Sequence, residues 1–256
     1  MSRVFITGSA DGLGQMAAQL LVDRGHRVVL HARNARRGQD ALAAVPRAET
    51  VVIGDLSSIV ETTDVARQVN ELGAFDAVVH NAGIGYREPR RIATADGLPN
   101  VFAVNTLAAY LLTALITPPR RLVYLSSNSH YRGDPSLIDL EWSARPWDGV
   151  QAYADSKLHD ALLACAVARL RADTFSNSVE PGWVPTKMGG PDAPDDMSQA
   201  AITQAWLAAG DDQAVQVTGR YFYHQQLRQP HPAVAKPEVQ DAFLAECARI
   251  SGVALA

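Results

Sequence analysis

The chain has 256 residues, of which 47% are hydrophobic, and a formal net charge of −4. This content is enough for one sizeable core, and no linker-like run divides the chain, so we expect one domain over residues 1–256. Lys and Arg do not form a block, which argues against nucleic acid as a partner. Cys165 and Cys247 belong to no metal-spaced or redox pair, so two reduced thiols are expected.

The first residues lead directly into a strand pattern and lack the features of a signal peptide. The most apolar stretch, Val101 to Ile116, contains Asn105, Thr106 and Thr113. It is shorter than the ~20 residues that a membrane-spanning helix needs. We therefore expect a cytoplasmic protein without a membrane partner.

Apolar runs of strand length alternate with segments of helix length along the chain. The expected strands are 3–6, 27–31, 51–53, 77–80, 121–125 and 174–179. The expected helices are 12–24, 60–72, 101–116 and 153–170. This alternation predicts an α/β fold with a doubly wound parallel sheet and helices on both faces. Ligands of such sheets bind beyond the carboxyl ends of the strands.

A glycine-rich turn follows the first expected strand and opens the first helix, with the sequence Thr7-Gly8-Ser9-Ala10-Asp11-Gly12-Leu13-Gly14. Glycines let the backbone approach a pyrophosphate, whose charge meets the free N–H groups of the helix. The spacing differs from the commoner Gly-x-Gly-x-x-Gly fingerprint of dinucleotide sites. A tight strand–helix turn without a ligand is the alternative interpretation.

The second strand ends in His31-Ala32-Arg33-Asn34 and carries no acidic residue that would bind the ribose hydroxyls of NAD(H). The guanidinium of Arg33 suits a 2′-phosphate, so NADP(H) is favoured over NAD(H). Arg36 and Arg37 are candidates to assist, and a solvated basic turn is the alternative. Asp55, followed by Leu56 after the third strand, is a candidate acceptor for the adenine amino group.

Tyr153 and Lys157 stand four residues apart in an expected helix, so they are neighbours on one face. An ammonium beside a phenol favours the phenolate and makes tyrosine a usable proton donor and acceptor near neutral pH. Ser126 and Ser127 end the fifth strand, where a hydroxyl can bind the oxygen of a substrate. Hydride transfer needs a polarised carbonyl beside C4 of a nicotinamide.

These motifs occur in one order over nearly the whole chain, which resembles the single-domain short-chain dehydrogenases/reductases with their Rossmann fold. The motifs are Thr7-Gly8 to Gly14, Asn81-Ala82-Gly83, Asn105, Ser126-Ser127, Tyr153-xxx-Lys157 and Pro181-Gly182 to Thr186. Residues 125–130, 152–158 and 218–222 are most similar to the retinol-dehydrogenase-like and WW-domain-oxidoreductase-like branch.

The resemblance implies a role for each motif. Tyr153 would be the acid/base, Lys157 would assist it and bind the nicotinamide ribose, and Asn105 would hold a water near Lys157. Ser127 would orient the carbonyl, with Ser126 as the neighbour that could be confused with it. The implied cofactor contacts are Gly8, Ser9, Asp11, Gly12, Leu13, Gly14, Asn81, Ala82, Gly83, Pro181, Gly182, Val184 and Thr186.

The chain departs from the family pattern in two places. His80 stands where the family often has a second Asn, which would alter packing under the cofactor. The expected substrate loop at about 187–200 is short, so we do not carry over a retinoid substrate. The helices at 101–116 and 161–170 have little polar surface, which favours a homodimer or homotetramer; coverage by the rest of the chain is the alternative.

The preferred function is an NADP(H)-dependent oxidoreductase acting on a small-molecule carbonyl or alcohol. A non-catalytic NADP(H)-binding sensor or scaffold of the same fold is the alternative, although such a protein would tolerate loss of Tyr153 or Lys157. A sugar-nucleotide epimerase or dehydratase shares Tyr-xxx-Lys but usually has a larger C-terminal domain. Seven histidines without ligand spacing do not suggest a metal.

Overall fold

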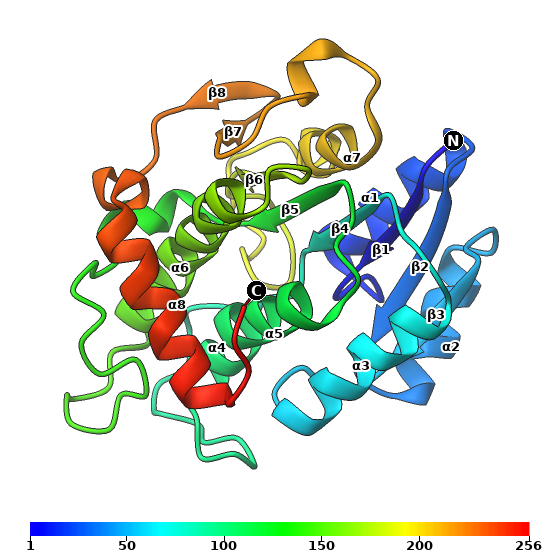
Figure 1. Cartoon of the computed structure of the whole chain (residues 1–256). Coiled ribbons are helices and arrows are strands. Elements are labelled where there is room, and N and C mark those ends of the chain that lie inside the picture. Colours follow the sequence, from blue (N-terminus) through cyan, green and yellow to red (C-terminus); the bar gives the residue numbers. More distant parts are fainter. Residues whose placement is uncertain (256) are drawn as a thin grey trace.

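The computed structural model describes residues 1–255, in which eight strands form one sheet in the order β3-β2-β1-β4-β5-β6-β7-β8 (Figure 1). Neighbouring strands are parallel except β8, which runs antiparallel to β7. The strands are β1 (Arg3–Ile6), β2 (Arg27–Ala32), β3 (Thr50–Ile53), β4 (Ala77–His80), β5 (Arg121–Leu125), β6 (Phe175–Glu180), β7 (Tyr221–Tyr223) and β8 (Gln226–Arg228). The predicted α/β fold with a doubly wound sheet is confirmed, and the last two strands were not predicted.

The longer helices cover both faces of this sheet. They are α1 (Gly12–Asp23), α2 (Ala35–Ala44), α3 (Ile59–Glu71), α5 (Ala108–Leu115), α6 (Gly149–Leu170), α7 (Ile202–Ala209) and α8 (Pro237–Ser251). Short helical segments are α4 (Asn100–Phe102), the π-helical turn Ala103–Leu107, and 3-10 turns at Asn128–Arg132, Met197–Gln199, Gln213–Val215 and Pro232–Ala235. Helices α2, α7 and α8 were not predicted from the sequence.

Alternation along the strands builds one core on each face. In β5, Leu122 and Tyr124 belong to the cluster that contains residues of α3, α5 and α6. Val123 and Leu125 point the other way, into the cluster with residues of α1, α2 and α7. Because both faces are covered, the inner strands β1, β4 and β5 are mostly apolar rather than alternating with polar residues, whereas β6 buries the polar Ser176, Asn177 and Ser178. Strand order reverses between β1 and β4, so the carboxyl ends around them border the crevice where ligands of such sheets bind.

The expected single helix over 101–116 is wrong in one respect, because its middle forms a π-helical turn around Asn105. The side chain of Asn105 accepts a hydrogen bond from Ile84 N at 2.8 Å and donates one to Ile84 O at 3.1 Å. These two bonds tie the helix to the segment after β4. Such π turns are rare and frequently occur at functional sites.

The apolar faces proposed for an oligomer interface are covered within the chain. Helix α8 packs on α6 (Figure 1). Its Phe243 and Cys247 are fully buried in the same core cluster as residues of α6. The C-terminal residues cover α5, where the Tyr110 hydroxyl donates to Val253 O at 2.8 Å. The exposed apolar surface that favoured an interface on these two helices is therefore absent among residues 1–255. Association of copies through another surface stays a prediction. Among residues 1–255, no helix combines the length and apolar character that crossing a membrane requires.

Candidate active site

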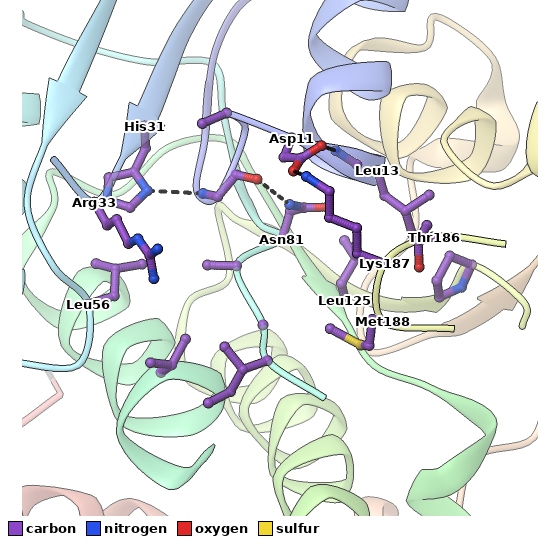
Figure 2. A pocket seen from close by; sticks show the side chains of 18 of the residues that line it. Asp11, Leu13, His31, Arg33, Leu56, Asn81, Leu125, Thr186, Lys187 and Met188 are labelled. Atoms are coloured by element: carbon purple, nitrogen blue, oxygen red, sulfur yellow. Dashed lines mark hydrogen bonds and ion pairs between the residues drawn. The ribbon is translucent and has the colours of Figure 1, made fainter. Parts of the chain in front are cut away.

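A cavity of about 850 Å³ opens where the segments after β1 to β6 meet (Figure 2). Fourteen of the predicted cofactor and catalytic residues line it, and they come from all six of these segments. They are Gly8, Asp11, Gly12, Leu13, Arg33, Asp55, Leu56, Asn81, Ala82, Gly83, Tyr153, Lys157, Pro181 and Thr186. The glycine-rich turn and Tyr153 thus line one common cavity.

The glycine-rich turn packs directly against the segment after β4. Gly8 has a φ of +61°, and a Cβ added there would lie 2.8 Å from the Cα of Ala82. Gly14 does not line the cavity, but a Cβ added there would lie 2.4 Å from Asn81 Nδ2. Asn81 Nδ2 in turn donates to Thr7 O at 3.0 Å and Gly8 O at 3.2 Å. These contacts hold the turn in place and require residues without a side chain.

Asp11 caps the N-terminus of α1 by accepting a hydrogen bond from Gly12 N at 2.8 Å. It also forms an ion pair with Lys187, which reaches across from the segment after β6 (Figure 2). A second ion pair joins Asp11 to Arg37 at 3.3 Å. The hydrogen bond from Lys187 is the main cause that lowers the pKa of the Asp11 carboxyl. The two cations offset the carboxylate at the point where a helix N-terminus attracts an anion.

His31 is a site residue that the sequence analysis did not single out. Its Nδ1 accepts from Gly8 N at 3.0 Å, and its Nε2 lies 3.0 Å from Gly54 O. Burial lowers the pKa of His31 to about 4, so the ring is neutral with its proton on Nε2. The residue lines the cavity and links the glycine-rich turn to the end of β3. Only the register of β1, β2 and β3 brings these groups together, and no local motif signals it.

Arg33 lies at the exposed end of β2 and lines the cavity (Figure 2). Within residues 1–255 it makes no hydrogen bond or ion pair, whereas Arg37 is engaged by Asp11. Arg36 does not line the cavity. Asp55 accepts a hydrogen bond from Ser57 N at 2.9 Å, which fixes its carboxylate at the same end of the cavity. This end therefore presents an unpaired guanidinium and an oriented carboxylate.

Tyr153 and Lys157 lie at the other end on α6. The Tyr153 hydroxyl is 3.9 Å from Met188 Sδ, and the ring of Tyr86 meets its ring edge-on at 5.7 Å between centroids. The Lys157 Nζ is 5.8 Å from the centroid of the Tyr153 ring. Burial disfavours the charge of Lys157, but the Asp160 carboxylate and Tyr153 outweigh it and raise the pKa of the ammonium. Lys157 is thus held as a cation next to the tyrosine.

The two serines have different environments. Ser126 lines the cavity, is buried, and donates its hydroxyl to Lys157 O at 2.7 Å. Ser127 does not line the cavity, and its Oγ accepts from Ser129 N at 3.2 Å as the cap of the following 3-10 turn. The hydroxyl hydrogen of Ser127 has no acceptor among residues 1–255, whereas that of Ser126 is already used.

Asn105 is buried behind the cavity wall rather than on it. Besides its bonds to Ile84, its Nδ2 donates to Ser156 Oγ at 3.0 Å. Gly83 lies between Asn105 and the lysine, since a Cβ on it would be 3.7 Å from Asn105 Oδ1 and 3.6 Å from Lys157 Nζ. Asn105 therefore positions the segment that separates it from Lys157.

Four other predicted cofactor contacts lie outside the cavity lining and have structural partners. Ser9 Oγ accepts from His31 N and donates to Ile6 O, both at 2.8 Å. Gly182 has a φ of +88° and packs against Asp195, while Val184 is buried. Gly14 packs on Asn81, as described above. Several residues that were not predicted also line the cavity. Two are polar, His31 and Lys187, and most others are apolar, among them Ile84, Val104, Leu125, Met188 and Met197.

His80 and His130 have packing roles. His80 stacks on Tyr124 at 4.7 Å between ring centroids, and its Nε2 lies 3.2 Å from Thr113 Oγ1. His130 stacks on Tyr221, and its Nδ1 lies 2.7 Å from Ser127 O. In the described part of the chain, no group of three or more His, Cys, Asp or Glu side chains could hold a metal ion.

Comparison with known proteins decides the family. The model of the short chain dehydrogenase family matches residues 2–196. The chain belongs to this family. An uncharacterized oxidoreductase of Emericella nidulans is 46% identical over 257 residues, covering 99% of this chain and 98% of the relative. Retinol dehydrogenase 13 of Mus musculus is 29% identical, covering 99% of this chain and 84% of that protein.

The fold of this short-chain dehydrogenase agrees with solved structures. A protein from Mycobacterium Paratuberculosis superimposes with a TM-score of 0.85 at 22% identity, over 100% of this chain and 95% of that one. The predicted resemblance to the family, including its retinol-dehydrogenase-like branch, is confirmed. The chain is thus an oxidoreductase of the short-chain dehydrogenase family, a class consistent with NAD(P)-dependent hydride transfer.

Proposed function

We propose that this short-chain dehydrogenase transfers a hydride between NADP(H) and a small-molecule carbonyl or alcohol. The observation that carries the proposal is one cavity with the Tyr153–Lys157 pair at one end and the unpaired Arg33 at the other. A binding protein without turnover would need the second feature but not the first. The proposal includes a cytoplasmic location, which the free Cys165 and Cys247 support.

The residues around the cavity fit a dinucleotide phosphate. Gly12 and Leu13 line the cavity at the start of α1, and an added Cβ at Gly12 would meet nothing within 4 Å, so an anion could approach this helix N-terminus closely. Arg33 would hold the 2′-phosphate, and Asp55 with Leu56 would border the adenine. Thr186 and Pro181 would contact the nicotinamide half. When bound, the cofactor supplies or accepts the hydride at its nicotinamide ring.

The protein side of the reaction is proton transfer at the Tyr153 hydroxyl. In reduction, Tyr153 gives its proton to the carbonyl oxygen, and in oxidation the phenolate takes the proton from the alcohol. The Lys157 ammonium favours the phenolate through its charge. Ser127 would orient the substrate oxygen, which its uncommitted hydroxyl hydrogen supports, and Asn105 would hold the backbone that borders Lys157.

The walls near Tyr153 indicate which part of a substrate would lie there. Met188 lies next to the Tyr153 hydroxyl, the Tyr86 ring packs against the Tyr153 ring, and Val104 adds apolar surface to the cavity lining. Apolar walls exclude water and favour a substrate whose carbonyl or alcohol carries a hydrophobic substituent.

The test is a fluorescence titration of the purified protein with NADPH and NADH, combined with Tyr153→Phe. NADPH should bind much more tightly than NADH, and Tyr153→Phe should retain NADPH binding but lose turnover of carbonyl compounds. Removal of a general acid typically costs on the order of 100- to 10,000-fold in rate. Binding of neither cofactor would reject the proposed NADP(H)-dependent hydride transfer. Full activity of Tyr153→Phe would reject the acid/base role.

A further inference from the structure

Lys157 has a buried ionic partner on its own helix. Asp160 follows it by one turn of α6, and its Oδ2 accepts a hydrogen bond from Lys157 Nζ at 2.8 Å. The two side chains are 5% and 4% exposed. The same Nζ donates to Leu125 O at 2.6 Å. Two of the three donors of the ammonium are therefore fixed from within the protein, and the third remains for the cavity that Lys157 lines.

Asp160 does not line the cavity and contacts neither the expected cofactor nor a substrate. Its effect on the site must therefore pass through Lys157. Burial of an unpaired ammonium disfavours its charged form, whereas a carboxylate at hydrogen-bond distance restores it. A buried lysine of this kind thus depends on its partner for both orientation and charge.

The other groups around Asp160 leave Lys157 as its charged neighbour. From β5, Tyr124 feels the charge of Asp160, but burial is the main cause that raises the pKa of this phenol, so it is neutral. Its hydroxyl is bonded to Thr113 of α5, and the charge of Arg171 acts on Tyr124. From β4, His80 stacks on Tyr124, and burial lowers its pKa to about 3, so it is neutral as well.

We propose that Asp160 is a positioning residue for Lys157, and that its negative charge sets the pH range in which Tyr153 exchanges its proton. The proposal rests on the function of Tyr153 proposed above. In the native pair, the carboxylate offsets part of the field that the ammonium exerts on the phenol. The enzyme therefore keeps Tyr153 protonated to a higher pH than an unpaired lysine would allow.

Removal of the carboxylate charge has a defined direction. In Asp160→Asn, the amide oxygen can still accept from Lys157, but the charge of the ammonium is no longer balanced. Its full field reaches Tyr153, so the phenolate forms at a lower pH. The buried ammonium itself also loses its proton at a lower pH. Both limbs of the pH–activity profile should consequently move toward acid, by about one pH unit.

The decisive experiment follows phenolate formation without a substrate. The near-ultraviolet absorbance of the wild type is titrated with pH and the curve of Tyr153→Phe is subtracted, and the same is done in the Asp160→Asn background. Asp155→Asn is the matched control, because Asp155 is a buried carboxylate on the same helix that pairs at 2.8 Å with a partly exposed cation, Arg145. We expect an acid shift of about one pH unit for Asp160→Asn and none for Asp155→Asn.

The outcomes separate this proposal from the proposed function. An unshifted midpoint in Asp160→Asn, or an equal shift in Asp155→Asn, would overturn the role of Asp160 and leave the acid/base role of Tyr153 intact. Full turnover by Tyr153→Phe would instead reject the proposed function itself. Once a substrate is found, kcat/KM of Asp160→Asn should show the same acid shift of both limbs.

A measurement on the wild type covers the case in which Asp160→Asn does not fold. The chain has three lysines, Lys157, Lys187 and Lys236, and the latter two are exposed. Nitrogen-15 NMR of the side-chain amino groups can follow each one, with substitution of Lys187 and Lys236 giving the assignment. Lys157 should keep its proton to a pH at least as high as the two exposed lysines. Loss of its proton at a lower pH would mean that Asp160 does not balance its charge.

Discussion

The backbone N–H of Gly8 donates a 3.0 Å hydrogen bond to Nδ1 of His31, which connects the glycine-rich turn to the second strand. The opposite nitrogen of the ring lies 3.0 Å from Gly54 O, so one neutral imidazole bridges two backbone segments. A charged imidazole could not accept from Gly8, because both of its nitrogens carry protons. The conformation of the turn therefore depends on the protonation state of His31.

His31→Phe should keep the ring but leave Gly8 N and Gly54 O without their partner. Each unpaired buried group costs about 1–3 kcal/mol, so the free energy of unfolding should fall by a comparable amount. We also expect the affinity for NADPH to fall about tenfold, since the turn is no longer fixed. His159→Phe is the matched control, because His159 is equally buried but bonds to Thr106 away from the cavity. Comparable loss of NADPH affinity in both variants would contradict a specific role of His31.

Stability should decrease as the solution is acidified below the ordinary pKa of histidine. Burial lowers the pKa values of four histidines, to about 3 for His80 and about 4 for the other three, His31, His130 and His159. Below about pH 6.5 the unfolded chain binds protons that the folded chain does not, so the stability present above this pH is lost progressively down to about pH 4. Asp160 and Glu180, whose pKa values burial raises, act in the opposite direction but are fewer.

We expect the free energy of unfolding to fall by about 4 kcal/mol between about pH 7.5 and pH 5.5, since each of the four histidines contributes about 1.4 kcal/mol over this interval and the raised pKa of Asp160 offsets part of the sum. Denaturant unfolding at a series of pH values measures this change. A stability that is constant or that rises over this interval would show that these histidines are not held neutral in the folded chain.

Gly12→Ala tests whether the start of α1 approaches a ligand. Gly12 and Gly25 both have positive φ values, +54° and +82°, and in both cases an added Cβ would meet nothing within 4 Å. Alanine at either position costs about 1–2 kcal/mol of backbone strain. Only Gly12 lines the cavity, so Gly12→Ala should also weaken NADPH binding by roughly tenfold or more, while Gly25→Ala should not. Equal NADPH affinities of the two variants would mean that the phosphates of the cofactor do not bind at the start of α1.

Local sequence patterns predicted those parts of the fold that depend on neighbouring residues alone, such as apolar runs and glycine positions. Apolar runs located six strands, and the glycine spacing located the turn, because Gly8 needs its positive φ and Gly14 its missing side chain. The contribution of His31 was not predictable, since it depends on how three strands align. The π-helical turn at Asn105 likewise results from bonds to Ile84, which lies 21 residues away.

Two helices and the serine pair likewise could not be predicted from local patterns. Helix α2 (Ala35–Ala44) is polar and rich in Arg and Ala, so its pattern is weak in isolation. Helix α8 was missed, and with it the cover over α6, which led to an interface being expected on a face that is already buried. The spacing of Tyr153 and Lys157 was readable from the sequence, but which of Ser126 and Ser127 has a free hydroxyl required the structure.

Arg33→Asp should reverse the preference between the two nicotinamide cofactors. The guanidinium has no partner among residues 1–255, so its replacement breaks no internal contact and should leave the stability nearly unchanged. A charge-assisted hydrogen bond is worth about 1.5–3 kcal/mol, so NADPH binding should weaken by roughly 10- to 100-fold. NADH should bind more tightly than to the wild type, because a carboxylate at this place can accept from the ribose hydroxyls. Arg36→Asp makes the same charge change on an exposed residue outside the cavity. If both variants weaken NADPH equally, the effect is long-range attraction of charge and Arg33 does not contact the 2′-phosphate.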